Sequence, residues 1–416
     1  MSNSFSSSFK FKFSCIVAFI VLLWAPLNRW VIGIDGAGRI PLALLLLACI
    51  LLGSKIGTVS LKKPLTIYIV FAFYVLINGL VHESYLNYEG NGIYVMTVNL
   101  LCPVLFLLVV SCIAYYDFDK TLKWITWSLL LYCLLCILFG KMSDDERLGG
   151  ELNANGMAIY ADFAFYCLLL QYMIGKRSLI SLLIFSIIPI FLIVITGSRT
   201  GFLLLVIVAV LSILLFYKRG HIGSVFLVVT IAVVLVLGFS YVMNNTVLGE
   251  RLQNSATQME GNKYETGTVI DKFGDRGPQF YWSWPYFLEH PVFGIGLANW
   301  RNASGFPYVL HSEWLVQYVE NGLVALFTYL LFFFTLLKNA MLVSRRLYDS
   351  DKRIMRILIY SLLSVFLLNF ASWTYNCYCV FAFYAFVYSF TKQKKNIMRN
   401  CLKIDKKRLY RRKKVI

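Results

Sequence analysis

Four basic residues have the chemistry to act on a sugar carried by a diphosphate, provided that one surface brings them together. They are Arg147, Arg199, Arg276 and His311. Imidazole titrates near neutral pH, so a neutral His311 can accept a proton from a sugar hydroxyl. Guanidinium groups bind diphosphate in a bidentate manner and neutralise the charge on a departing diphosphate. One base and several arginines are therefore the set that glycan transfer from a lipid diphosphate requires.

The surroundings of Arg199 allow two interpretations. It lies in the segment Ile195-Thr-Gly-Ser-Arg-Thr-Gly201, between two very apolar helices, and Gly197 and Gly201 are expected to permit a tight turn. An arginine at that depth is costly unless it is paired, which favours a function. The alternative is an arginine whose head simply extends to the membrane interface.

Further residues are candidates for substrate binding. Arg147 precedes Asn153, which begins the next apolar stretch and has the ordinary alternative role of a helix cap. Trp282 and Trp284 belong to an aromatic segment at 280–287. Aromatic faces stack on sugars, but anchoring at a membrane interface is the commoner role of such residues.

The elements that must position these residues are membrane helices. Hydrophobic residues make up 59% of the 416 residues and charged residues only 14%, against about 45–50% and about 25% in soluble domains. Backbone groups in hydrocarbon must be paired within a segment, so the apolar blocks are helical. The sequence predicts an all-α polytopic integral membrane protein with about 12 transmembrane helices. The expected spans are 13–34, 38–53, 65–81, 94–115, 122–140, 155–174, 178–196, 200–217, 223–242, 313–337, 354–371 and 373–391.

The distribution of Lys and Arg predicts which loops share a side. The net charge of +18 indicates topology rather than nucleic-acid binding, because Lys and Arg collect in cytoplasmic loops. The basic loops all fall on one side of the predicted helices, together with the basic tail at 392–416. That tail is expected to anchor the topology or to lie on anionic headgroups. The candidate residues fall on the opposite, extracytoplasmic side.

Five regions follow from this topology. The N-terminal helices occupy 1–140, the central helices and the Arg199 turn 141–243, and the C-terminal helices 313–391. Between them, one large outer loop at 244–312 is too long for a mere connection and carries many aromatic residues, which argues against disorder. The basic tail follows. An acidic run, Asp144, Asp145 and Glu146, is interpreted as a solvated loop rather than a metal site.

At this point the sequence resembles the O-antigen ligase and polymerase superfamily of bacterial surface-glycan assembly. The resemblance is best from about Arg147 to Leu326. It rests on the Gly-Ser-Arg-Thr-Gly turn at 197–201, on Arg276 and on the Pro-x-x-Gly-x-Gly element at 291–296. The pair His311-Ser312, followed after nine residues by Gly322, completes it, whereas Ala325 is a mild departure from the small residue, such as Gly or Thr, that is often found there.

The resemblance implies a GT-C-like membrane fold in the bacterial inner membrane, with the active site on the periplasmic side. It implies an inverting, metal-independent glycosyltransferase without cofactors that uses an undecaprenyl-diphosphate-linked glycan. Arg199 and Arg276 would hold the diphosphate, and His311 would activate or position the acceptor hydroxyl. Membrane lipid and a chain-length regulator are the other expected partners, and nucleic acid is not.

Four possible functions stay open. A Wzy-like polymerase of O-antigen, capsule or exopolysaccharide is favoured, and a WaaL-like ligase that transfers glycan to lipid A-core is the alternative. A flippase for lipid-linked oligosaccharides is a rival of another class, but it predicts charges distributed along the spans. Charge within the predicted spans is scarce, with Asp162 as the clearest case. A structural subunit without catalysis predicts that His311→Ala is harmless.

Overall fold

The computed structural model describes the chain except for 1–4, 6–7, 33–37, 88–91, 144–146, 150–151, 217–239, 255–259, 307–308, 373, 375–376 and 416. The side chains of 209, 211–216, 273–275, 349 and 402–415 are likewise not described. Most of the predicted span at 223–242 and the acidic run Asp144, Asp145 and Glu146 therefore lie outside the described residues.

The described residues form helices and one isolated bridge between Met142 and Leu148, which confirms the all-α expectation. The long elements are α2 (Phe9–Leu27), α3 (Arg39–Leu52), α5 (Leu65–Val81), α6 (Gly92–Tyr116), α7 (Phe118–Phe139), α8 (Ala154–Met173), α9 (Leu179–Ile195), α10 (Arg199–Phe216), α17 (Gly322–Ser344), α18 (Asp349–Leu368) and α19 (Tyr378–Val415).

Five segments of the described chain are long and apolar enough to cross a membrane by themselves, and they begin at Phe9, Gly92, Phe118, Ala154 and Gly322. Four shorter apolar helices accompany them: Arg39–Leu52, Leu65–Val81, Leu179–Ile195 and the first part of α10. The chain is therefore a multi-pass membrane protein, and the expected number of 12 spans stays a prediction.

Local sequence signals explain where several helices begin. The Asp117 carboxylate accepts a hydrogen bond from the Lys120 N–H at the start of α7, and the Ser178 hydroxyl accepts one from the Ser181 N–H at the start of α9. Such side chains satisfy backbone donors that the first turn of a helix leaves unpaired. Neighbouring helices then pack along the chain, as in the series α7, α8 and α9.

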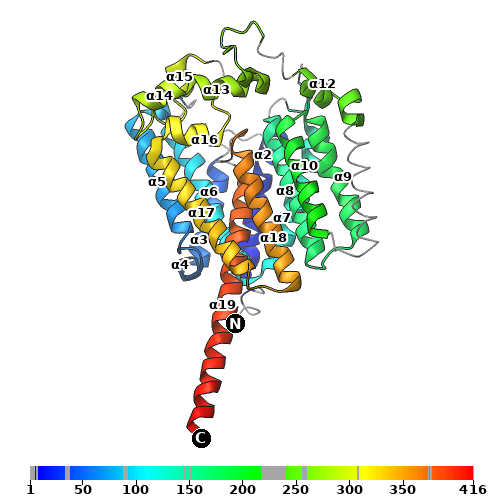
Figure 1. The fold of residues 1–416 in the computed structure, drawn as a ribbon, viewed down its shortest axis with the longest axis vertical. Coiled ribbons are helices and arrows are strands. Elements are labelled where there is room, and N and C mark those ends of the chain that lie inside the picture. Colours follow the sequence, from blue (N-terminus) through cyan, green and yellow to red (C-terminus); the bar gives the residue numbers. More distant parts are fainter. Residues whose placement is uncertain are drawn as a thin grey trace.

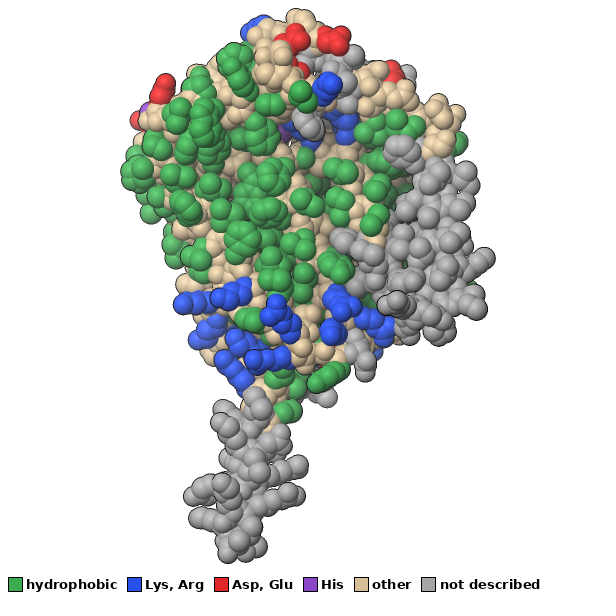
Figure 2. Space-filling model, viewed as in Figure 1, with side chains coloured by type: hydrophobic (Ala, Val, Ile, Leu, Met, Phe, Trp, Pro, Cys, Tyr) green, Lys and Arg blue, Asp and Glu red, His purple; other side chains and the backbone are tan. Residues whose placement is uncertain are grey.

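The two ends of the helical bundle differ in kind. Short helices cover one end, and α19 leaves the opposite end as a single straight helix (Figure 1). In Figure 2, Lys and Arg side chains form a belt where α19 emerges, hydrophobic side chains cover the middle, and acidic side chains are seen at the covered end. This is the charge asymmetry that the loops predicted. The basic tail continues α19, and its contact with anionic headgroups stays a prediction.

The covering elements belong mainly to the large loop. They are α12 (Val247–Gln253), the 3₁₀ helix η4 (Val269–Arg276), α13 (Gly277–Trp282), α14 (Trp284–Glu289) and α15 (Trp300–Ser304). After them, α16 (Glu313–Leu315) and the π-helical turn η5 (Val316–Glu320) precede α17. The predicted span at 313–337 is thus shifted, because the continuous apolar helix begins only at Gly322.

A backbone joint fixes this loop to the start of α17. The N–H groups of Ile295 and Gly296 donate to the carbonyls of Val319 and Glu320, at 3.1 and 2.7 Å. Gly322 has φ +74°, and a Cβ on it would lie 2.2 Å from the Val292 oxygen. A side chain there would open the joint, which explains why the motif residues at 291–296 and 322 occur together.

Candidate functional site

Arg199 and Arg276 line one cavity of about 540 Å³ at the covered end of the bundle. α10 contributes Arg199 from its first residue, and η4 contributes Arg276 from its last. Figure 2 shows Lys and Arg side chains recessed beneath the covering loop at this end. The remaining walls are mostly apolar. The lining residues are Arg199, Thr200, Leu203, Ile270, Lys272, Arg276, Gly277, Phe280, Phe370 and Ala371.

A direct contact couples the two predicted arginines. Arg276 Nη1 donates a hydrogen bond to the Thr200 hydroxyl, and Thr200 is the residue after Arg199. Thr200 is buried, so this contact holds the Arg276 guanidinium next to the start of α10. The N-terminus of a helix carries a partial positive charge of its own, which adds to the two guanidinium groups. The arrangement favours a negatively charged ligand.

Arg147 holds the backbone of the turn that precedes Arg199. Its Nε donates to the Thr196 carbonyl at 3.0 Å, and Arg251 Nη1 donates to the Gly197 carbonyl at 2.7 Å. From the other side, the Ser198 hydroxyl donates to Asn155 Oδ1 at 2.8 Å. Arg147 is thus in contact with the predicted turn, while its predicted role in substrate binding stays a prediction.

The two glycines of the turn motif have different tasks. Gly197 has φ +58°, a conformation that favours glycine, and so it permits the turn as expected. Gly201 instead lies inside α10, where a Cβ would be 2.5 Å from the Cβ of Ala158 in α8. The expectation that Gly201 serves the turn is wrong, because its small size allows two helices to approach closely.

His311 is held between two elements that line the cavity. The backbone N–H of His311 donates to Gln279 Oε1 at 3.0 Å, and Gln279 lies on α13 three residues after Arg276. The following residue, Ser312, donates its hydroxyl hydrogen to the Asn369 carbonyl at 2.9 Å, next to the cavity-lining Phe370. The half-buried His311 is therefore tied to both sides of the cavity but is not one of the residues that line it.

Three other predicted residues do not line this cavity. Asn153 Oδ1 accepts hydrogen bonds from the N–H groups of Asn155 and Gly156, so its observed role is that of an N-cap of α8. Trp282 donates from Nε1 to the Tyr264 carbonyl at 2.9 Å. Trp284, which is 53% exposed, packs against Phe287. Sugar stacking on these two indoles stays a prediction.

Several residues of the site were missed by the sequence reasoning. Lys272 lines the cavity, Gln279 positions the backbone of His311, and Arg251 and Asn155 hold the turn. For Lys272, its place in the same short segment as Arg276 was the available signal. Gln279, Arg251 and Asn155 act through polar contacts to backbone or to another polar side chain, which no motif reveals. Among the described residues, no group of three His, Cys, Asp or Glu is placed to hold a metal ion.

The fold and this cavity define an all-α membrane protein with a cationic site at one end of its helices. Residues 184–330 match the family model described as O-antigen ligase, and this stretch contains Arg199, Arg276 and His311. This match confirms the resemblance of residues 184–330 to the O-antigen ligase and polymerase superfamily. The match supports an enzyme of the ligase or polymerase type and gives no support to a flippase. No curated protein matches the chain.

Proposed function

We propose that this protein transfers a glycan from an undecaprenyl-diphosphate-linked donor, as a polymerase of O-antigen, capsule or exopolysaccharide. The reaction takes place on the periplasmic face of the bacterial inner membrane. The belt of Lys and Arg at the opposite end supports this orientation, because such belts face the cytoplasm. A chain-length regulator is a candidate partner.

The observation that carries the proposal is the meeting of Arg199 and Arg276 at one largely apolar cavity. A polyprenyl diphosphate combines a double negative charge with a long hydrocarbon chain. The guanidinium groups suit the diphosphate, and the walls formed by Leu203, Phe280 and Phe370 suit the first isoprene units. Lys272 is a third cation at the same cavity.

The proposed step is an inverting displacement at the anomeric carbon of the donor sugar. The acceptor hydroxyl oxygen attacks that carbon, while the bond from the carbon to the diphosphate oxygen breaks. The hydroxyl proton passes to a neutral His311 imidazole, and the bonding electron pair leaves with the diphosphate. Arg199 and Arg276 stabilise the charge that develops on the leaving group, so no metal ion is required by the proposal.

The acceptor distinguishes the two members of the superfamily. In a polymerase the acceptor is another lipid-linked repeat, whereas in a ligase it is lipid A-core. The experiment compares a strain that lacks this chain with the same strain after the chain is expressed in it, and displays the surface glycan of both on a gel. The glycan that is lost in the strain without the chain identifies the function. Loss of long chains with one repeat retained on core indicates a polymerase. Loss of all glycan from core, with lipid-linked polymer accumulating, indicates a ligase.

The assigned residues are tested in the same assay. Arg199→Ala and His311→Ala are expected to give the same surface glycan as the strain that lacks the chain, although the variant protein is present at a normal level. Matched controls are Arg301→Ala and His290→Ala, because both residues are exposed on the same loop and outside the cavity. A normal pattern in either site variant contradicts the assignment of that residue.

A further inference from the structure

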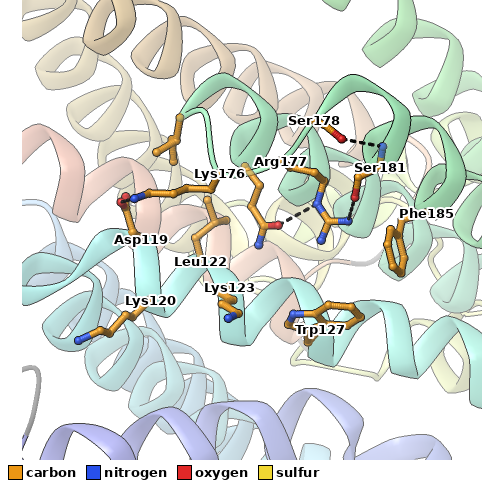
Figure 3. Close-up of a pocket in the computed structure, with 12 residues that line it drawn as sticks. Asp119, Lys120, Leu122, Lys123, Trp127, Lys176, Arg177, Ser178, Ser181 and Phe185 are labelled. Carbon is orange, nitrogen blue, oxygen red and sulfur yellow. Dashed lines mark hydrogen bonds and ion pairs between the residues drawn. The ribbon is translucent and has the colours of Figure 1, made fainter.

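A second cavity, of about 620 Å³, lies at the opposite end of the bundle. It is formed by the first turns of α7 and by the connection between α8 and α9, as Figure 3 shows. Its cations are Lys120, Lys123, Lys176 and Arg177, and its aromatic rings are Trp127 and Phe185. The proposed glycan transfer uses none of these residues.

Carboxylates neutralise only part of this charge. Lys176 pairs with Asp119 at 3.5 Å, and Lys120 pairs with Asp117 at 3.3 Å. Arg177 instead donates from Nε to Gln171 Oε1 and from Nη1 to the Ser181 hydroxyl, both at 3.0 Å and both to neutral groups. Within the described part of the chain, Lys123 and Arg177 have no carboxylate partner, so the cavity keeps an excess of positive charge.

The Arg177 side chain is held in place before any ligand arrives. Its guanidinium carbon lies 4.6 Å from the centre of the Phe185 ring and 5.8 Å from that of Trp127. Gln171, which fixes its Nε, is buried and is itself anchored by a 2.8 Å hydrogen bond to the Thr126 hydroxyl. Figure 3 shows the guanidinium beside both rings, with Lys123 on the neighbouring helix. A fixed guanidinium fork loses little conformational entropy when it binds an anion.

The surroundings of the cavity indicate which carrier brings the anion. α9 begins at this cavity and presents a strongly apolar, outward-facing surface formed by Ile180, Leu183 and Ile184, which are 71%, 61% and 58% exposed. Such a surface on a membrane helix contacts acyl chains. Basic pockets between membrane helices on the cytoplasmic side bind the headgroups of anionic lipids. The cations of this cavity lie at the end of α9 where its exposed apolar surface begins, which is the arrangement that a headgroup with attached acyl chains requires.

We propose that this cavity binds a phosphate group through Lys123 and Arg177, and that the group belongs to an anionic phospholipid. The phosphate accepts hydrogen bonds from the Arg177 fork and from the Lys123 ammonium, and the acyl chains follow the apolar side of α9. A free phosphate ester has the same headgroup chemistry, but it gains nothing from the α9 surface.

The experiment uses the full chain in nanodiscs of phosphatidylcholine with increasing phosphatidylglycerol, and native mass spectrometry counts the retained lipids. Lys123→Gln removes a charge without breaking a contact that the structure gives, and Arg177→Gln removes the fork. Each is expected to weaken retention of phosphatidylglycerol at least five-fold, whereas Lys338→Gln, an exposed lysine near the same end, leaves it unchanged. Arg177→Lys keeps the charge but loses the fork, and it is expected to give an intermediate result.

Glycerol phosphate and inorganic phosphate form the second arm. Millimolar glycerol phosphate or inorganic phosphate is added as a competitor. If either displaces the lipid as well as excess phosphatidylglycerol does, the assignment to a lipid is overturned. Retention in Lys123→Gln and Arg177→Gln equal to that of the parent chain would overturn the site itself. Lys123→Gln breaks no hydrogen bond or ion pair among the described residues, so it is expected to fold normally, and a thermal midpoint checks this.

Discussion

The two cavities at the ends of the bundle are both cationic, but they are assembled in different ways. The cavity at the loop-covered end, named the outer cavity, unites α10, the loop at 270–280 and the residues after α18, which lie far apart in the sequence. The cavity at the opposite end, named the inner cavity, is built from 119–127 and 171–185, on helices that follow one another and pack together. The first depends on the whole fold, whereas the second depends on one group of neighbours.

This difference has consequences for function. In the outer cavity Arg276 is held by Thr200 from a different helix, so a ligand there senses the relative positions of distant elements. Transition-state stabilisation requires such fixed positions, because donors must not reorganise during the reaction. In the inner cavity the exposed Lys123 has no fixed partner among the described residues, which suits a site that binds but does not react.

The largest expected effect is a difference in the rate of glycan transfer between variants of Arg276 and of Lys123. Arg276→Ala is expected to lower the rate of glycan transfer by about 10²–10³-fold, the usual loss when one donor to a developing negative charge is removed. Lys123→Gln is expected to change the rate by less than about two-fold, since surface substitutions away from a site are usually nearly neutral. The measurement is the initial rate with purified protein and a lipid-linked donor.

A restored rate in Arg276→Lys would show that charge alone is needed, whereas a continued loss would show that the fork geometry matters. If Lys123→Gln reduced the rate as strongly as Arg276→Ala, the two ends would not be independent and the comparison would fail.

The sequence predicted the class of fold and part of the outer site for clear physical reasons. Apolar blocks must be helical in hydrocarbon, so the ranges 65–81 and 94–115 came close to α5 and α6. Arg199 and Arg276 stood out because the loops on that side are poorer in Lys and Arg than the loops on the opposite side. Their meeting was expected from topology, which places both on one surface but cannot give the contact through Thr200.

What the sequence could not show depends on tertiary contacts. Gly201 was assigned to the turn because only its neighbours in the sequence could be considered. Its close contact with Ala158 lies between two helices, and the sequence alone does not reveal such a contact. The start of the span was placed near 313 because η5 still carries Val316, Tyr318 and Val319. In the structure, the carbonyls at the end of η5 accept hydrogen bonds from the loop, and the continuous apolar helix begins only at Gly322. The inner cavity was interpreted only as topology, since a positive loop has no visible shape in a sequence.

A substitution at the joint under the loop is expected to affect the outer end alone. Gly322→Ala combines a φ of +74° with a contact of 2.2 Å to the Val292 oxygen, so about 3 kcal/mol or more of stability should be lost. Gly305→Ala is the matched control, because its φ is +64° but its Cβ would meet open space, which leaves only the backbone cost of about 1–2 kcal/mol. Thermal midpoints measure both.

Lipid retention at the inner cavity should survive in Gly322→Ala, while glycan transfer should fall. Simultaneous loss of both in a protein that is still folded would mean that the two ends are coupled through the bundle. An unchanged thermal midpoint in Gly322→Ala would mean that the backbone at 291–296 can move to accommodate the new Cβ without loss of stability. This would contradict the prediction from the geometry.

The smallest expected effect is a dependence of stability on pH that comes from the same joint. Glu320 lies before the apolar helix α17 and is 3% exposed, and its carboxylate accepts the N–H groups of Ala298 and Trp300 at 2.9 and 3.2 Å. Burial raises the pKa of Glu320 from 4.5 to about 7, although these two donors act in the opposite direction. The folded state therefore binds the proton more tightly than the unfolded state.

The sign follows directly. The stabilising contribution of protonated Glu320 is complete below pH 4.5 and is lost as the pH rises through about 7, a change of at most about 3 kcal/mol. Glu320→Gln should flatten this part of the curve of thermal midpoint against pH, and the exposed Glu289→Gln should leave it as in the parent chain. If the two variants gave the same curve, Glu320 would not be the group that titrates. If the thermal midpoint rose with pH in the parent chain but not in Glu320→Gln, the sign of the predicted pH dependence would be reversed. The ionised form of Glu320, and not the protonated form, would then be the one that stabilises the joint.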